Sequence, residues 1–241
     1  MKKVIAVLAV AIMLFGTGAT WAASSVLVYG GVMNKYVIGN GIISAKDPVA
    51  QGGVKFSFEN GTYLDLWLSR RFSDAEGNAY GNESDLTLGW SGAVGSVSVD
   101  TGVAVFNLYP TTRVDRNDVT QLFAEVSPKT AWTIGTTTLS PYVRLEVVSS
   151  TGMGFRNEPI YFVGLRHTWS ATGRLSVLQR LQISEQPDLP GVSGGVVVSY
   201  KLQVPYTIGG ITVTPLYERI HPIINGRPKS NILGLQFARV F

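Results

Sequence analysis

The sequence predicts an all-β chain that folds as a transmembrane antiparallel up-and-down β-barrel, and three observations support this prediction. Apolar and polar residues alternate along repeated segments, tight turns alternate with longer polar loops, and aromatic residues gather at the segment ends. The composition agrees, because 45% of the residues are hydrophobic and only 15% are charged, against about a quarter charged in a typical soluble domain. Much of the apolar surface is therefore expected to face lipid or a large packed core rather than water.

The N-terminal residues are typical of a secretory signal peptide that is removed by cleavage. Lys2 and Lys3 precede an apolar run from Val4 to Phe15, and small residues lead into Ala22-Ala23. The apolar run is shorter than the roughly 20 residues that a membrane-spanning helix needs. We therefore predict two parts, a signal peptide over residues 1–23 and a barrel over residues 24–241.

Twelve alternating segments follow, and helical periodicity is absent from them. Their predicted spans are 25–38, 49–58, 62–72, 83–91, 95–109, 119–134, 137–148, 160–170, 173–183, 194–208, 210–220 and 230–241. The pattern is clearest where Leu64, Leu66 and Leu68 share one face and Asp65 and Ser69 share the other. A soluble β-sandwich alternates in the same way with its apolar face inward, so periodicity alone leaves both architectures open.

Connection lengths favour the membrane barrel over the sandwich. Tight turns are predicted at Asn60-Gly61, Ser91 to Val94, Gly135-Thr136, Ala171-Thr172 and Gly209-Gly210, and longer polar loops separate the remaining segments. Short turns on one rim and longer loops on the other are typical of outer-membrane barrels. With twelve strands, both ends of the barrel chain lie on the tight-turn side, which is expected to be the periplasm.

Aromatic residues favour the barrel more strongly, because amphipathic rings concentrate where a lipid-facing band meets water. Those on the apolar parity at tight-turn or terminal ends are Phe58, Trp90, Trp132, Trp169, Tyr206 and Phe241. Those on the same parity at loop ends are Tyr36, Tyr109, Tyr161 and Tyr217. A sandwich core would not sort its aromatic residues by strand end.

The last segment resembles the recognition signal of bacterial outer-membrane barrels. Leu233, Leu235 and Phe237 alternate with polar or small residues, and the chain closes on Phe241. Arg239 departs from the signal, although an arginine near the interface can extend to water at modest cost. The segment predicts outer-membrane lipid and the barrel-assembly machinery as partners.

A set of short motifs lies between residues 47 and 92: Asp47 to Gly53, Asn60 to Tyr63, Leu66 to Ser69, and Glu83 to Trp90. Together they resemble the TorF-type porins of proteobacteria. The resemblance implies an outer-membrane barrel of about this length in a family without a defined substrate. It carries over no catalytic residues.

Charged residues on the polar parity are the candidate pore lining. They are Lys35, Lys55, Asp65, Arg71, Asp85, Asp100, Glu125, Arg144, Glu146, Arg166, Arg174, Arg180, Lys201 and Glu218. We expect them inside, because a lysine or arginine facing lipid costs roughly 2 to 4 kcal/mol at mid-membrane. They could line a narrow pore whose slight cationic excess favours small anions, or close the barrel as a salt-bridged plug.

The sequence thus predicts an outer-membrane, porin-like channel for passive diffusion of small solutes, with a preference for anions. The alternative is a closed structural or adhesin-like barrel without conductance. We predict no enzyme activity and no catalytic, cofactor or metal site: the chain lacks cysteine, its two histidines are far apart, and His167 has no serine beside it on its face. The net charge of +4 includes the two lysines of the signal peptide, so the barrel itself is near +2, which is too small to predict nucleic acid as a partner.

Overall fold

The structure is a computed structural model, and it describes residues 23–38, 42–73, 82–107, 118–150, 155–172, 175–186, 195–223 and 229–241. Within these ranges, no helix is long and apolar enough to cross a membrane. Residues 1–22 of the predicted signal peptide lie outside the described residues, as do the aromatic Tyr109 and the predicted lining residue Arg174.

Strands make up most of the described chain. Their bounds are β1 (Ser25–Met33), β2 (Tyr36–Ile38), β3 (Ile42–Ala45), β4 (Val49–Ser57), β5 (Thr62–Arg71), β6 (Glu83–Val94), β7 (Val97–Asn107), β8 (Val119–Pro128), β9 (Trp132–Ile134), β10 (Thr137–Ser150), β11 (Phe155–Ser170), β12 (Ser176–Gln186), β13 (Gly195–Gln203), β14 (Tyr206–Ile208), β15 (Ile211–Pro222) and β16 (Ser230–Val240).

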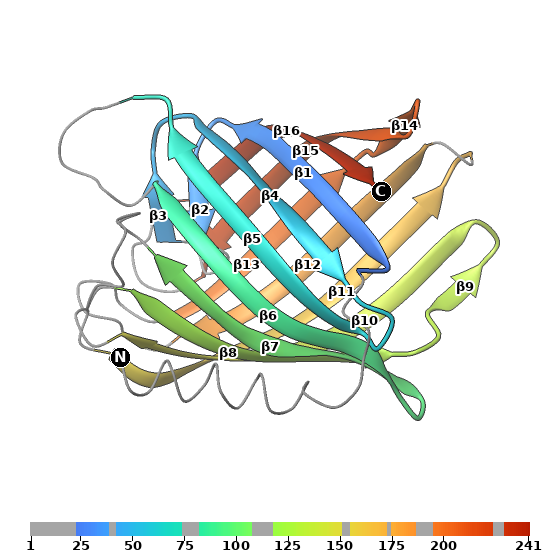
Figure 1. Ribbon diagram of the computed structural model, residues 1–241, viewed down its shortest axis with the longest axis horizontal. Helices are drawn as coiled ribbons and strands as arrows, with labels where there is room; N and C mark the ends of the chain where they lie inside the picture. Colours follow the sequence, from blue (N-terminus) through green and yellow to red (C-terminus); the bar gives the residue numbers. More distant parts are fainter. Residues whose placement is uncertain are drawn as a thin grey trace.

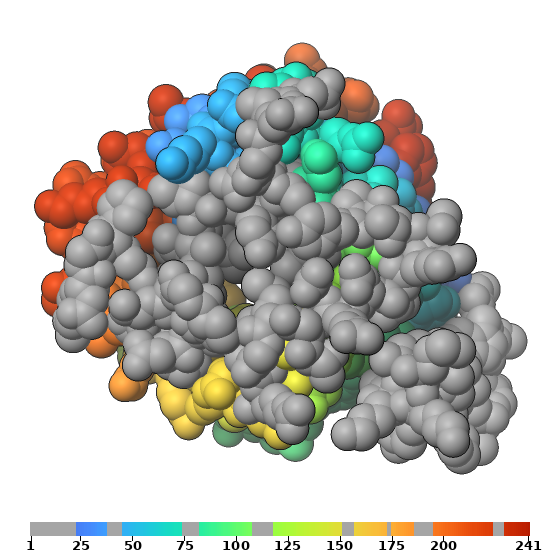
Figure 2. All heavy atoms as spheres, turned by 90° about the vertical axis from the view of Figure 1, so that its left-hand side faces the viewer, coloured from blue at the N-terminus to red at the C-terminus, as the bar shows by residue number. Residues whose placement is uncertain are grey.

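One antiparallel sheet closes on itself into a barrel (Figure 1). It contains 14 strands, of which β9 and β14 are three-residue continuations of β8 and β13, so twelve strands form the wall. Consecutive wall strands pair with each other, and β16 pairs with β1 to complete the ring. Viewed toward the loop end, the wall passes from blue through green, yellow and red back to blue (Figure 2). The predicted fold class and the number of strands are confirmed.

The tight turns follow the prediction with one correction. Strand β6 continues through residues 91–94, which were predicted as a turn, and Val94 is the register partner of Val97. The turn lies at Gly95-Ser96 instead, where Gly95 has a φ of 60°. A glycine adopts this left-handed conformation at little cost, so it takes the turn in preference to the small residues before it.

Two predicted strand ends are also corrected at the loop end. Strand β10 runs to Ser150 and β11 starts at Phe155, so both are longer than the alternation predicted. Conversely, the first predicted segment is too long, because β1 ends at Met33. There the Asn34 side-chain oxygen accepts a hydrogen bond from the Leu233 backbone N–H (2.8 Å). The Asn34 backbone N–H donates in turn to the Leu233 carbonyl (2.9 Å). The chain then leaves the wall.

The apolar parity of the wall strands faces outward. Val163 is 60% exposed while its neighbour Phe162 is 6% exposed, and Leu122 is 54% exposed while Phe123 is 7% exposed. A soluble sandwich would show the reverse, since water penalises contiguous exposed apolar surface. The outer face is therefore suited to lipid, as outer-membrane barrels require.

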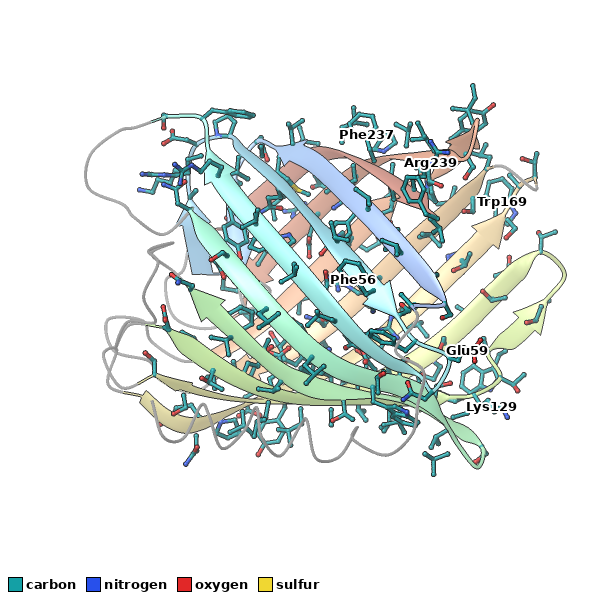
Figure 3. The ribbon with its side chains drawn as sticks, in the orientation of Figure 1. Phe56, Glu59, Lys129, Trp169, Phe237 and Arg239 are labelled. Atoms are coloured by element: carbon teal, nitrogen blue, oxygen red, sulfur yellow. The ribbon has the colours of Figure 1, made fainter. Side chains whose placement is uncertain are left out.

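Aromatic residues mark the tight-turn end of this outer face. The exposed ones are Trp132, Trp169, Tyr206 and Phe241. Figure 3 shows Trp169, Phe237 and Arg239 on the outside of the wall, with Glu59 and Lys129 near the tight-turn rim. The Arg239 guanidinium lies 4.7 Å from the centre of the Phe241 ring. This arrangement agrees with the predicted interface belt at this end.

Tyr36 is a correction to the predicted belt at the loop end. Because the chain leaves the wall after Met33, the alternation of β1 no longer determines which way the Tyr36 side chain points. The Tyr36 ring lies inside the barrel, 5.6 Å from the ring of Trp67. Tyr36 begins β2, which pairs only with β3 in a separate two-stranded sheet. The β2–β3 hairpin therefore lies in the loop-end mouth of the barrel (Figure 1).

Both ends of the described barrel meet at the tight-turn rim. The Val26 and Phe241 backbones exchange two hydrogen bonds, of 3.1 and 2.9 Å, and Ser24 donates to the Ser57 carbonyl at 2.8 Å. The predicted placement of both termini on the tight-turn side agrees with this geometry.

Because the apolar parity faces outward, a charged side chain placed at the centre of the outer face should strongly destabilise the barrel. Val163→Arg should lower the free energy of unfolding in lipid vesicles by roughly 2 to 4 kcal/mol, because the guanidinium would face acyl chains. Urea titration of the refolded protein, followed by tryptophan fluorescence, measures the loss. Val163→Thr is the control and should cost much less. Equal stability of Val163→Arg and wild type would contradict the assignment of this face to lipid.

Candidate functional site: the inner wall

The predicted lining residues in the described ranges lie on the inner parity of the wall or at its loop-end rim, and they are all partly buried. Strand pairing brings many of them side by side, and the charges fall into two groups. Glutamates and a row of cations lie on β8 to β15, whereas aspartates prevail on β5 to β7.

The first group is an ion-pair network that skips strands. Arg166 on β11 reaches across β10 to Glu125 on β8, with 2.6 Å between Nη2 and Oε1. Arg144 on β10 binds Glu146 at 2.7 Å and lies 3.9 Å from Glu125. Pairs two strands apart meet here because the inner face of a barrel is concave and its side chains converge.

The network continues through a row of cations in register. Arg166 is the register partner of Arg180, and Arg180 is the partner of Lys201. Like charges directly opposite each other on neighbouring strands are destabilising. Glu218 offsets the repulsion, since its two oxygens lie 3.1 Å from Arg180 Nη2 and 3.8 Å from Lys201 Nζ.

The cations extend further into the interior than the carboxylates. The Arg166 and Arg180 side chains are 41% and 34% exposed, whereas Glu125 and Glu218 are 14% and 12% exposed. Because these side chains point inward, their exposed area belongs to the interior of the barrel. The interior therefore has room for water at their level.

A second type of contact joins strands through a tyrosine that lies across a glycine. Tyr142 on β10 covers Gly164 on β11 and donates a 2.7 Å hydrogen bond to Gln182 on β12. A Cβ atom on Gly164 would overlap the Tyr142 ring. The glycine is therefore required by close approach of the ring to the backbone.

The same arrangement supports the aspartates of the second group. In one case Tyr29 covers Gly53 and donates to Asp65, and in the other Tyr63 covers Gly89 and donates to Asp100. The two hydrogen bonds to the aspartates measure 2.8 and 2.9 Å. Lys55 lies 3.7 Å from the centre of the Tyr63 ring. Charge-assisted hydrogen bonds and a cation–π contact thus hold this half of the lining in place.

Sequence reasoning missed several inner-wall residues. Glu83 is on the inner face and only 4% exposed, but it begins β6 and was overlooked beside the predicted loop. It adds a carboxylate, so the cationic excess predicted from the sequence is smaller than expected. Tyr29, Tyr63 and Tyr142 share the parity of the charged residues, so the sequence contains a signal that they face the interior. Which glycine each tyrosine covers depends on strand register.

Toward the loop end, two apolar clusters line the interior on β8 to β16. One buried cluster comprises Val148, Ile160 and Phe162, with Val119 packed against it. The other comprises Val197, Leu216, Ile220 and Ile232, with Met33 and Val37 packed against it. The interior on these strands therefore has two levels, a charged, partly exposed level and an apolar level next to the mouth.

The described residues contain no group of three or more His, Asp or Glu side chains placed to hold a metal ion. His167 lies opposite Leu139 on one side and Gln179 on the other. These register partners include no serine that the imidazole could activate.

The closed wall, the outward apolar band and the charged lining together define the fold of an outer-membrane β-barrel. Residues 21–165 match the family model described as a bacterial protein of unknown function, Gcw_chp, and the chain belongs to that family. No curated protein matches the sequence. The TorF-type resemblance stays a prediction from the motifs.

Solved structures support the fold. The KdgM porin has a TM-score of 0.57 at 7% identity, with 90% of this chain and 99% of that chain covered. An outer-membrane channel from Pseudomonas putida F1 has a TM-score of 0.52 at 12% identity, covering 94% and 98%. LpxR from Salmonella typhimurium has a TM-score of 0.57 at 9% identity, covering 90% and 100%. At these identities the likeness shows the shared barrel fold alone.

The contact between Tyr142 and Gly164 predicts non-additive stability. Gly164→Val should cost roughly 1 to 3 kcal/mol of unfolding free energy by displacing the ring. The same substitution should cost less than half as much in a Tyr142→Ala background, where the ring is gone. Urea unfolding of all four proteins in vesicles gives the coupling. Equal costs in both backgrounds would show that the ring does not lie on the glycine.

Proposed function

We propose that this protein is a porin-like channel of the bacterial outer membrane for passive diffusion of small hydrophilic solutes. The observation that carries the proposal is the lining: the inward Arg166 and Arg180 side chains are 41% and 34% exposed, inside a wall whose outer face is apolar. A packed structural core would bury such groups rather than leave them accessible to water.

Three further observations support the proposal. The resemblance to TorF-type porins points to the same class, and two of the structures with a similar fold are described as a porin and an outer-membrane channel. The N-terminal signal and the alternation ending at Phe241 fit export and insertion by the barrel-assembly machinery. In this orientation the tight turns and both termini of the barrel face the periplasm.

We further propose a mild preference for anions. The carboxylates equal or nearly equal the cations in number, but the ion pairs place glutamate oxygens against the wall and leave arginine nitrogens toward the lumen. A passing solute therefore meets cationic groups first on β10 to β13. Selectivity in such pores follows the charges that line them.

A closed barrel without conductance is the second candidate. It is favoured by the apolar level at the loop end and by the β2–β3 hairpin in the mouth. Single-channel recording of the refolded, signal-free protein in a planar bilayer separates the two. Discrete conductance steps are expected. A silent protein that is folded, as shown by its heat-modifiable mobility in detergent gels, would reject the channel.

The lining predicts which residues set the selectivity. The double variant Arg166→Gln, Arg180→Gln should shift the anion-to-cation permeability ratio from above one to below one, because Glu125 and Glu218 lose their partners. Reversal potentials under a salt gradient measure the ratio. Arg70→Gln, at an exposed position on the outer parity of β5, is the matched control and should leave it unchanged. An unchanged ratio in the double variant would place the selective site elsewhere.

A further inference from the structure

We propose that the β2–β3 hairpin is the constriction of this channel, held in the barrel mouth by Tyr36 against β5 and β6 and by Val37 against the apolar cluster on β13, β15 and β16. The inference rests on the proposed channel and specifies what limits the size of its solutes. It assigns a positioning role to Tyr36, a residue that the sequence placed on the outer surface.

The contacts of the hairpin reach two separate parts of the wall. Tyr36 contacts Trp67 on β5 and donates a hydrogen bond to Glu83 on β6. Val37, the next residue, packs against the apolar cluster on β13, β15 and β16. Strand β2 contacts β16, which lies three strands from β5 in the ring of twelve wall strands. The two contacts therefore span a quarter of the ring, with β1 and β4 between them.

On the β6 side, the hairpin is held by a polar contact in a largely buried position. Burial, together with the negative charges of Glu83 and Asp85, raises the pKa of the Tyr36 phenol well above its usual value. The phenol is therefore protonated at neutral pH and serves as a hydrogen-bond donor. The Glu83 carboxyl accepts this bond. A buried carboxyl is costly to leave without its donor, so Tyr36 is held firmly.

Both ends of the hairpin are fastened to the wall. Before β2, Asn34 exchanges hydrogen bonds with Leu233 on β16. After β3, Asp47 accepts a 2.8 Å hydrogen bond from Ser73, and the Pro48 carbonyl accepts one from Phe72 at 3.1 Å. With fixed ends and contacts on two parts of the wall, the hairpin is held inside the mouth rather than hanging free in it.

Removing the Tyr36 contacts should widen the path. In Tyr36→Ala we expect single-channel conductance to rise at least about two-fold and larger polyethylene glycols to enter the pore. Tyr36→Phe keeps the ring against Trp67 and should give less than half of that increase. Tyr161→Ala is the matched control, since this loop-end tyrosine is 53% exposed on the outer face and should leave conductance unchanged.

Each outcome is informative. If wild type conducts and Tyr36→Ala matches it in conductance and polymer cut-off, the channel stands and the constriction is elsewhere. If wild type is silent and Tyr36→Ala conducts, the hairpin is a complete plug, which supports its place in the mouth and rejects an open resting channel. If both are folded and silent, the proposed channel and its constriction both fail.

A cross-link tests the position of the hairpin without relying on conductance. The chain has no cysteine, and β2 contacts β16. A disulfide between Val37→Cys and Ile232→Cys should therefore form on mild oxidation of the folded protein. The pair Val37→Cys, Phe162→Cys joins β2 to a distant wall strand and should stay reduced. Failure of the first pair to cross-link in a folded barrel would overturn the proposed arrangement.

Discussion

The structure depends on one constraint: in lipid, every backbone N–H and C=O group needs a partner within the protein. Twelve wall strands meet it only because β16 pairs with β1, and the two hydrogen bonds between Val26 and Phe241 complete that seam at the tight-turn rim. Closure also determines the polarity of the wall. Once the outer parity faces acyl chains, the polar residues of each strand have only the interior to face.

The interior must then satisfy many polar groups within a curved wall. It does so with contacts that reach over a neighbouring strand, such as Arg166 to Glu125 and Tyr142 to Gln182. Glycines make this possible, because only a residue without a side chain leaves room for a ring to cross its strand. The polar lining is therefore a brace between strands and, in the proposed channel, also its functional surface, so substitutions in it should affect stability and permeation together.

The two levels of the interior reconcile a partly exposed lining with a partly occupied mouth. The charged level on β10 to β13 contains partly exposed arginine side chains, while the apolar level packs against Val37 and Met33. In the proposed channel, the charged wall would select solutes by charge, and the hairpin in the first long connection would select them by size.

Much of the fold could be predicted from the sequence, because strand periodicity is local. Alternate residues share a face, so Leu64, Leu66 and Leu68 identify the outer face without any knowledge of the neighbouring strands. The C-terminal strand and the glycine turns were predictable for the same reason. The register between strands and the inward folding of the β2–β3 hairpin could not be predicted from the sequence. The glycine that Tyr142 covers depends on how β10 pairs with β11, and Tyr36 faces Glu83 only because Asn34, bonded to Leu233 nearly two hundred residues away in the chain, turns the backbone off the wall. Such contacts join residues far apart in sequence, and only the closed barrel brings them together.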